Sequence, residues 1–386
     1  MPRRDPLPTP AADALGAQAA PETGGILTID LEAIVANWRE LGERVAPAAC
    51  AAVVKADGYG CGLEAVSSAL ARAGCTTFFV AHVAEGRAVR SAAPAATIYV
   101  LNGLLPGTAP AYVGCNLHPI LGSLAELAEW QAFVAATGWH GGAALHVDTG
   151  MNRLGLAFEE AVWVAAQPPA TRGEVVLLIS HLACAEAPDH PLNARQLAAF
   201  GELRALFPGV PGSLANSSGI FLGPDAHHDM VRPGVALYGG NPTPLHVNPM
   251  RPVVRLCGRI IQVRTVAQGE TVGYGATWTA TRSTRIAVVS IGYGDGVLRA
   301  ASASDGRAGA EVIVAGHRCP LAGRISMDLL AIDVSNVPEG LPRRGDMATL
   351  IGEEITVDEL ASHAGTIAYE ILTSLGRRYA RVYKGG

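Results

Sequence analysis

The chain has 386 residues, a formal net charge of −5, 49% hydrophobic and only 16% charged residues. This length favours two domains with a sizeable core, and the mild acidity with scattered arginines argues against a nucleic-acid-binding protein. The sequence has no apolar run long enough to span a membrane and no signal-peptide core. Its seven cysteines are widely spaced and include no CxxC pair, which is typical of reduced thiols. We therefore expect a cytoplasmic protein with no membrane or nucleic-acid partner.

Taken in order, the chain begins with residues 1–24, a stretch of Pro, Ala and polar residues that predicts a disordered tail. A short strand at 26–30 and a helix at 31–45, with one apolar stripe, follow. Eight apolar runs then alternate with mostly helix-like segments: CAAVVK, TTFFVA, TIYVLN, NLHPIL, AALHVD, VVLLIS, PGSLAN and VALYGG. Eight such repeats predict a parallel sheet closed into a (β/α)8 TIM-type barrel, with an open doubly wound sheet as the alternative.

The alternation ends in a Pro-rich passage at 239–252, which indicates a domain boundary. Beyond it the segments are short, alternating and rich in β-formers, so we expect a mainly antiparallel β domain. The predicted division is a barrel over 25–245 and a β domain over 246–386. The strand at 26–30 is free to pair with the β domain.

Lys55 is one of only two lysines in the chain, the other being Lys384. It ends a run of small apolar residues and precedes a glycine-rich turn. Burial in such a place lowers the pKa of a lysine toward a neutral, nucleophilic amine, which Schiff-base chemistry uses. An ion-paired or snorkelling lysine at a strand end is the alternative interpretation of this stretch taken alone. Other residues of interest also follow the predicted strands: Asp148, Arg153, His181, Asn216, Ser217, Arg232 and Gly234.

Eight motifs follow one another along the chain: VVKADGYGCG, HVDTGMNRLG, SHLACAE, ANSSG, VRPGVALYG, GYGATW, GYGDG and RISMD. These motifs, in this order, resemble those of alanine racemases. Over residues 25 to 384 the chain resembles a bacterial alanine racemase. The resemblance implies a barrel that binds pyridoxal 5′-phosphate, a C-terminal β domain, and the interconversion of L- and D-alanine to supply D-alanine for peptidoglycan.

By this resemblance Lys55 is the lysine of the internal aldimine and one of two catalytic bases, and Tyr274 is the other. A racemase needs one base on each face of a planar carbanion, because a single base tends to return the proton to the side it came from. In the family the tyrosine comes from the neighbouring subunit, which implies a homodimer with shared active sites.

The resemblance also assigns supporting roles. Arg232 faces the pyridine nitrogen, and His181 lies between Arg232 and the tyrosine base. The positions that match cofactor-binding residues are Lys55, Tyr59, Arg153, His181, Asn216, Ser217, Arg232, Gly234, Val235 and Tyr369. The positions that match substrate-binding residues are Arg153, Met327 and Tyr293, the last as the inner gate of the entry channel.

The sequence departs from the family at His146, where many members have a carbamylated lysine that bridges to the residue matching Arg153. A histidine forms no such stable carbamate. A bound anion such as chloride, a nearby side chain or a neutral contact from His146 is then left to support Arg153.

Other functions stay open at this point. A racemase of broader or serine specificity differs only in pocket detail, and a non-catalytic carrier of the same cofactor needs the lysine but not Tyr274. A decarboxylase of similar barrel fold normally places a carboxylate where this chain has Arg232. The His, Cys and acidic residues around 181–190 and 227–229 fit no ligand spacing, so no catalytic metal is expected.

Overall fold

The computed structural model describes residues 21–139, 141–168 and 174–385. The tail expected at 1–24 therefore lies almost wholly outside the described residues. Contacts between residues divide the chain into two compact units, one made of residues 31–251 and the other of residues up to 30 together with 252–385. We describe each unit separately.

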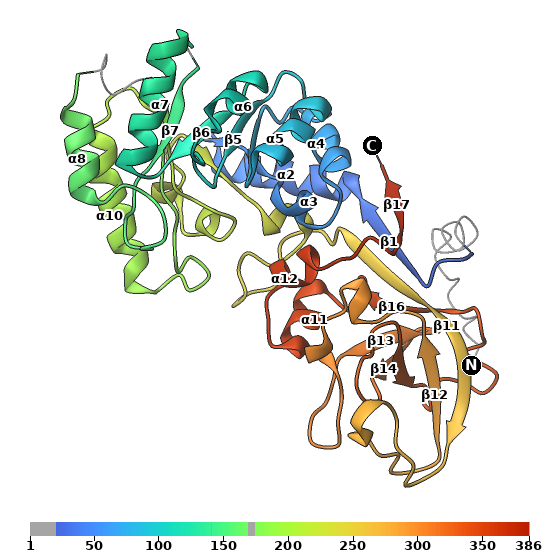
Figure 1. The fold of residues 1–386 in the computed structure, drawn as a ribbon. Coiled ribbons are helices and arrows are strands. Elements are labelled where there is room, and N and C mark those ends of the chain that lie inside the picture. The colour runs from blue at the N-terminus through green and yellow to red at the C-terminus, as the bar shows by residue number, and fades with distance from the viewer. Residues whose placement is uncertain (1–20, 140, 169–173, 386) are drawn as a thin grey trace. The chain divides into compact units, whose positions relative to one another are not determined.

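The unit of residues 31–251 is built around parallel strands with helices on their outer side (Figure 1). The strands are β2 (Ala49–Cys50), β3 (Ala52–Val53), β4 (Thr77–Val80), β5 (Thr97–Val100), β6 (His118–Leu121), β7 (Ala143–His146), β8 (Val175–Ile179), β9 (Gly212–Ser213) and β10 (Met230–Val231). Strands β3 to β9 pair in sequence order as one parallel sheet, and β10 pairs with β2. Their middle residues are almost all buried, as expected of parallel strands covered on both faces.

Backbone hydrogen bonds join the two ends of this sheet through β10. The amide of Asp229 donates to the carbonyl of Gly212 at 3.1 Å, and the amide of Ala51 donates to the carbonyl of Val231 at 3.0 Å. The predicted barrel is therefore confirmed, and the segment 49–53 and β10 are neighbouring strands in it.

The prediction of an eighth strand at VALYGG is wrong. Val235–Tyr238 forms a 3-10 turn (η3), in which the Leu237 amide donates to the Gly234 carbonyl at 2.9 Å. The eighth strand of the barrel is instead β10, which begins five residues earlier. Pro233 has no N–H to continue a strand ladder, and the backbone turns at Gly234.

Apart from α2 (Leu31–Val45), which precedes β2, the helices and turns of this unit connect consecutive strands. They are α3 (Lys55–Tyr59), α4 (Leu63–Arg72), α5 (Val83–Ala92), α6 (Ala109–Gly114), α7 (Leu124–Thr137), α8 (Phe158–Ala166), α10 (Pro191–Ala205), η1 (Gly219–Phe221) and η2 (Pro224–Ala226). Because each connection returns to a parallel neighbour, the carboxyl ends of all strands lie at the same end of the barrel.

The second unit is a mainly antiparallel sheet, as predicted. Its elements are β1 (Gly25–Asp30), β11 (Val254–Val266), η4 (Tyr274–Ala276), β12 (Thr284–Val289), η5 (Tyr293–Asp295), η6 (Arg299–Ala301), β13 (Glu311–Val314), β14 (His317–Pro320), β15 (Leu330–Asp333), β16 (Met347–Ile351), α11 (Val357–Ala364), α12 (Ala368–Thr373) and β17 (Ala380–Lys384). The long strand β11 pairs with β1, β12 and β16, all antiparallel. The first strand, β1, also pairs with β17, in parallel.

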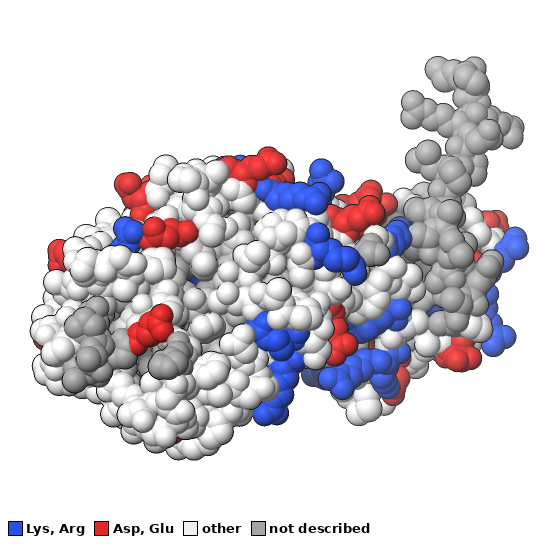
Figure 2. Space-filling view, turned by 90° about the horizontal axis from the view of Figure 1, so that it is seen from above, with Lys and Arg blue, Asp and Glu red and all other residues white. Residues whose placement is uncertain are grey.

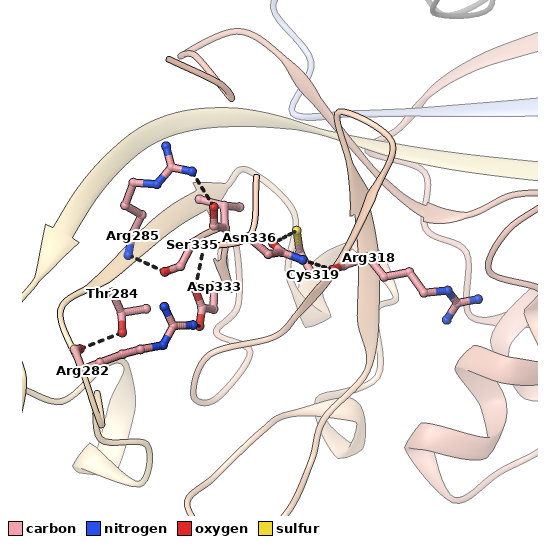
Figure 3. A network of polar contacts seen from close by, with 9 residues as sticks. Arg282, Thr284, Arg285, Arg318, Cys319, Asp333, Ser335 and Asn336 are labelled. Carbon is pink, nitrogen blue, oxygen red and sulfur yellow. Dashed lines mark hydrogen bonds and ion pairs between the residues drawn. The ribbon is translucent and has the colours of Figure 1, made fainter. Parts of the chain in front are cut away.

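Arg285 on β12 forms several hydrogen bonds with the turn that follows β15 (Figure 3). Its guanidinium donates to the carbonyls of Val334 at 2.8 Å, of Leu341 at 3.1 Å and of Val337. Its backbone N–H donates to the hydroxyl of Ser335 at 3.0 Å. One side chain thus satisfies three carbonyls of a turn that has no strand partner for them.

We expect Arg285→Met to lower the free energy of unfolding by about 1–3 kcal/mol, because three carbonyls lose a charged donor. Arg282 is a matched control in the same network. Its side chain is 62% exposed and makes one ion pair, with Asp333 at 3.4 Å, so Arg282→Met should cost less than about 0.5 kcal/mol. Urea unfolding of both variants measures the difference, and equal losses would contradict the bracing role of Arg285.

On the face shown in Figure 2, most of the surface is white, and red groups lie next to blue groups in several places. All seven cysteines are free thiols. Among the described residues, no helix is both long and apolar enough to cross a membrane, and no group of three or more His, Cys, Asp or Glu side chains is arranged to hold a metal ion.

Candidate active site

The polar residues singled out from the sequence follow successive barrel strands. Lys55 comes two residues after β3, His181 two residues after β8 and Ser217 four residues after β9. Arg232 directly follows β10. Since the strands are parallel, these side chains share the carboxyl-terminal end of the barrel, where barrel enzymes place their active sites.

The backbone after Lys55 makes a left-handed turn. Ala56, Asp57, Gly58 and Tyr59 all have φ between 52° and 60°. Left-handed backbone costs about 1–2 kcal/mol for a residue with a side chain, and only Gly58 escapes that cost. Such a run persists only where neighbours hold it. The Asp57 carboxylate provides one restraint by accepting the Leu63 amide at 2.9 Å.

Lys55 is partly buried, and two arginines influence its amine. Burial lowers its pKa first, and Arg153 and Arg232 lower the pKa further, while Glu85 opposes them. A lowered pKa increases the fraction of neutral amine, which is the nucleophilic and basic form.

Arg232 is buried and all of its hydrogen-bond partners shown here are neutral. One guanidinium nitrogen donates to the carbonyl and the hydroxyl of Ser213 at 2.7 and 2.6 Å, and the other donates to the Ser180 carbonyl at 2.6 Å. Burial lowers the pKa of Arg232 to about 10, so it remains a cation at neutral pH. These bonds fix the guanidinium without neutralising it.

The same guanidinium orients His181. A nitrogen of Arg232 lies 3.4 Å from Nδ1 of His181. Because arginine only donates, Nδ1 must accept, which leaves the ring proton on Nε2. Burial first, and then the charge of Arg232, lower the pKa of His181 to about 3, so the imidazole is neutral at pH 7.

Three of the positions that match cofactor-binding residues, Tyr59, Ser217 and Gly234, come together from separate segments and form what we call the cradle. The Ser217 hydroxyl accepts the Gly234 amide at 2.9 Å and the Ala236 amide at 3.3 Å. Tyr59 stacks on Tyr238, and its hydroxyl lies so near Gly234 that a Cβ there would meet it at 2.2 Å. Only glycine allows this close approach. Val235 is buried beside the cradle, and Asn216 caps η1 by accepting the Gly219 amide at 2.8 Å.

Arg153 sits on an exposed loop that is organised by one carboxylate. Asp148 accepts the amides of Gly150 and Met151 at 2.9 Å each, and both of its oxygens accept the amide of Asn152. His146, at the end of β7, is neutral because burial first, and then Arg232, lower its pKa to about 4.

The two neutral histidines make the fold acid-sensitive. Between pH 6.5 and about 4, the unfolded chain binds protons at His146 and His181 that the folded chain does not. The free energy of unfolding should therefore fall as the pH is lowered through this range, by roughly 1.4 kcal/mol per pH unit for each histidine.

We expect His146→Asn to reduce this slope. Urea unfolding at a series of pH values measures the slope for this variant and for the unmodified chain. Identical slopes in the His146 variant and the unmodified chain would show that His146 is not held neutral by the fold.

The remaining predicted site residues belong to the β unit. Tyr274 opens η4 and its side chain is 73% exposed, between Gly273 and Gly275 with φ of +83° and +77°. Met327 is 54% and Tyr293 42% exposed. Tyr369 lies in α12 and is partly buried.

Within that unit, the loops of Tyr293 and Met327 are tied together. The Tyr293 amide donates to the Ser326 carbonyl at 3.0 Å, and the Gly294 amide donates to the Met327 carbonyl at 2.8 Å. Arg378 adds an ion pair to each loop, with Asp295 at 2.7 Å and Asp328 at 2.8 Å. The loop of the predicted gate residue Tyr293 and the loop of the predicted substrate-binding residue Met327 are therefore joined by hydrogen bonds and through Arg378.

Sequence reasoning gave no role to Glu85, Asp148 or Arg378. Glu85 stands three residues after His82, the cap of α5, and that spacing signals a capping carboxylate. The Asp148 side chain holds amides two to four residues ahead, a common role of aspartate in turns. The contacts of Arg378 join segments about 50 and 83 residues away, and no local pattern signals them.

Comparisons with known proteins cover nearly the whole chain. The family model described as "Alanine racemase, N-terminal domain" matches residues 29–242, and "Alanine racemase, C-terminal domain" matches residues 253–383. The chain is 56% identical to "Alanine racemase" of Methylobacterium sp. (strain 4-46), over 93% of this chain and 98% of that protein. It is 48% identical to "Alanine racemase, catabolic" of Mesorhizobium japonicum, over 94% of both.

A solved structure is also similar over almost its full length. The crystal structure of alanine racemase from Bartonella henselae, with covalently bound pyridoxal phosphate, superposes with a TM-score of 0.88. It shares 39% sequence identity, and the match covers 94% of this chain and 99% of that one.

Proposed function

Because the chain belongs to the alanine racemase family, and is thus an isomerase acting on alanine, we propose that it works with pyridoxal 5′-phosphate through two bases, Lys55 and Tyr274. The observation that carries this proposal is the environment of Lys55. A partly buried amine of lowered pKa shares the barrel end with two guanidinium groups and a cradle of hydroxyls and amides. No catalytic metal is part of the proposal.

The residues present fit the cofactor. A phosphate needs hydrogen-bond donors with room for close approach. Tyr59 and Ser217 would supply hydroxyls, and the glycine at 234 has no side chain to block the approach. Val235, Asn216 and Tyr369 complete the proposed phosphate site. Lys55 would hold the cofactor covalently, and Arg153 would contact its phenolate oxygen. Arg232 would face the pyridine nitrogen and keep it unprotonated, because an arginine does not supply a proton at neutral pH.

When bound, the cofactor supplies a conjugated ring that withdraws electrons from Cα of the amino acid and makes its Cα–H bond acidic. Lys55 then exchanges the proton on one face of Cα, and Tyr274 exchanges it on the other. His181, neutral and oriented by Arg232, presents its Nε2–H toward the tyrosine. Arg153 and the Met327 amide hold the substrate carboxylate, and Tyr293 limits the size of the side chain that enters.

We also propose a homodimer in which the two bases of each site come from different subunits. Tyr274, Tyr293 and Met327 are all markedly exposed in a single chain, which suits residues that complete the site of a second copy. The Lys55 side of one subunit would then meet the Tyr274 side of the other.

The biological role is proposed as the supply of D-alanine for peptidoglycan, in the cytoplasm, where seven free thiols remain reduced. The catabolic use of D-alanine is the alternative, and one similar protein carries that word in its name. Loss of growth without added D-alanine in a deletion strain would support the biosynthetic role, and growth without it would contradict that role.

An assay of the full-length chain with the cofactor tests the function directly. Incubation with L-alanine followed by chiral separation should give equal amounts of the two enantiomers. A cofactor carrier would leave L-alanine unchanged, and a decarboxylase would consume it. The same assay with L-serine measures the breadth of substrate specificity. Turnover of serine equal to that of alanine would contradict an alanine-specific site.

A further inference from the structure

The carboxylate of Glu85 reaches the turn that carries Lys55. One of its oxygens accepts the Ala56 amide at 2.7 Å, directly after the lysine. The other oxygen accepts the amides of Ala81 at 2.7 Å and of His82 at 3.1 Å. The bond to His82 is the ordinary cap of helix α5. The bond to Ala56 is not, because it joins the segment after β4 to the segment after β3.

This bond sits at the start of the left-handed turn. The run from Ala56 to Tyr59 has three residues with side chains in a conformation they rarely adopt. Later amides of the turn bond to the turn itself, as when the Gly60 amide donates to the Ala56 carbonyl at 2.9 Å. The Ala56 amide instead depends on Glu85.

Glu85 also balances the charge around Lys55. The ionisable groups that influence the amine are Arg153 and Arg232, which both lower its pKa, and Glu85, which raises it. His181 is a fourth neighbour, and Lys55 in turn contributes to the lowered pKa of His181. Among these groups, Glu85 is therefore the only one that carries a negative charge.

We propose that Glu85 is a positioning residue for Lys55, holding the left-handed turn that places the lysine and Tyr59 and setting the charge balance at the lysine amine. This inference deepens the proposed function and rests on it for the role of Lys55. The turn itself can be tested without the cofactor.

The chain offers a matched control in Glu126. On helix α7 it accepts the amides of Gly122 and Leu104 at 2.8 Å each and bonds to the Ser123 hydroxyl at 3.0 Å. Glu126 thus caps its own helix and reaches a preceding loop, as Glu85 does, but that loop carries no lysine. Glutamine in either place has one acceptor oxygen instead of two and directs an NH2 group at backbone donors.

The first experiment compares hydrogen exchange in the full-length chain without cofactor, for Glu85→Gln and Glu126→Gln. We expect faster exchange over residues 54–62 in the Glu85 variant, and an unchanged rate there in the Glu126 variant. Equal exchange over 54–62 in both variants would overturn the claim that Glu85 holds the turn, whether or not the cofactor binds.

The second experiment adds pyridoxal 5′-phosphate to the same proteins. We expect Glu85→Gln to weaken its binding about tenfold. The pH profile for trapping the Lys55 adduct with borohydride should shift to lower pH, because a raising influence on the Lys55 pKa is gone. Glu126→Gln should leave both unchanged, and Glu85→Asp, which keeps the charge, should restore the pH profile more than the affinity.

The outcomes separate the two proposals. Glu85→Gln matching Glu126→Gln in affinity and pH profile would make Glu85 an ordinary helix cap and overturn the inference. Absence of an adduct at Lys55 in the unmodified chain would contradict the proposed function, and the exchange rates over 54–62 would still decide the role of Glu85 in the turn.

Discussion

Lys55→Ala is expected to lower alanine racemisation by a factor of at least about 10⁴, because a base contributes about 10²–10⁴ and the covalent anchor of the cofactor is lost as well. The visible absorption of the bound cofactor and its borohydride-trapped adduct should disappear together. Lys384→Ala is the matched control, since it removes the other lysine of the chain, at the exposed end of β17.

The Lys384 variant should keep full activity and a full yield of adduct. Adduct formation and racemisation that both survive in Lys55→Ala would remove Lys55 from the mechanism. Loss of both activity and adduct in Lys384→Ala would indicate that Lys384, and not Lys55, binds the cofactor covalently.

Tyr274→Phe is expected to lower racemisation by about 10²–10⁴ in both directions while the Lys55 adduct still forms. The phenol oxygen is the group lost, and the exposed ring of Tyr274 makes a large loss of stability unexpected. Tyr383→Phe removes a hydroxyl from another exposed tyrosine of the same unit and should leave turnover unchanged. Unchanged turnover in the Tyr274 variant would exclude it as a base.

The two inactive variants also test the shared active site. If Lys55 of one subunit works with Tyr274 of the other, a mixed dimer has one complete site and one site that lacks both bases. Random mixing then restores about a quarter of the original activity. No recovery in dimers shown to have exchanged subunits would contradict sites built from two chains.

The fold was predictable where the pattern was local. Runs such as TTFFVA and VVLLIS contain an uninterrupted stretch of apolar residues, FFVA and VVLLI, as is typical of buried parallel strands. The run VALYGG is equally apolar but forms a turn, because Pro233 and Gly234 interrupt the ladder just before it. Burial of Val235–Tyr238 explains the composition of that run, and composition alone did not distinguish a buried turn from a strand.

The site was predictable to the extent that its residues follow strand ends in recognisable motifs. Lys55, His181 and Arg232 were predicted in this way, and all three follow the carboxyl ends of barrel strands. The contacts of Glu85 were not, because the helix-capping signal around His82 gives no indication that the same carboxylate also binds the Ala56 amide, 29 residues earlier. Long-range pairs of this kind depend on which strands become neighbours, and only the folded chain shows that.

Isotope incorporation during racemisation tests the two-base proposal most directly. The unmodified chain, loaded with pyridoxal 5′-phosphate, is incubated with L-alanine in deuterated water and sampled early. We expect D-alanine with deuterium at Cα while the remaining L-alanine is mostly undeuterated, because separate bases act on the two faces. D-alanine that keeps the original hydrogen would contradict this account in favour of a single base, and absence of D-alanine would contradict it altogether.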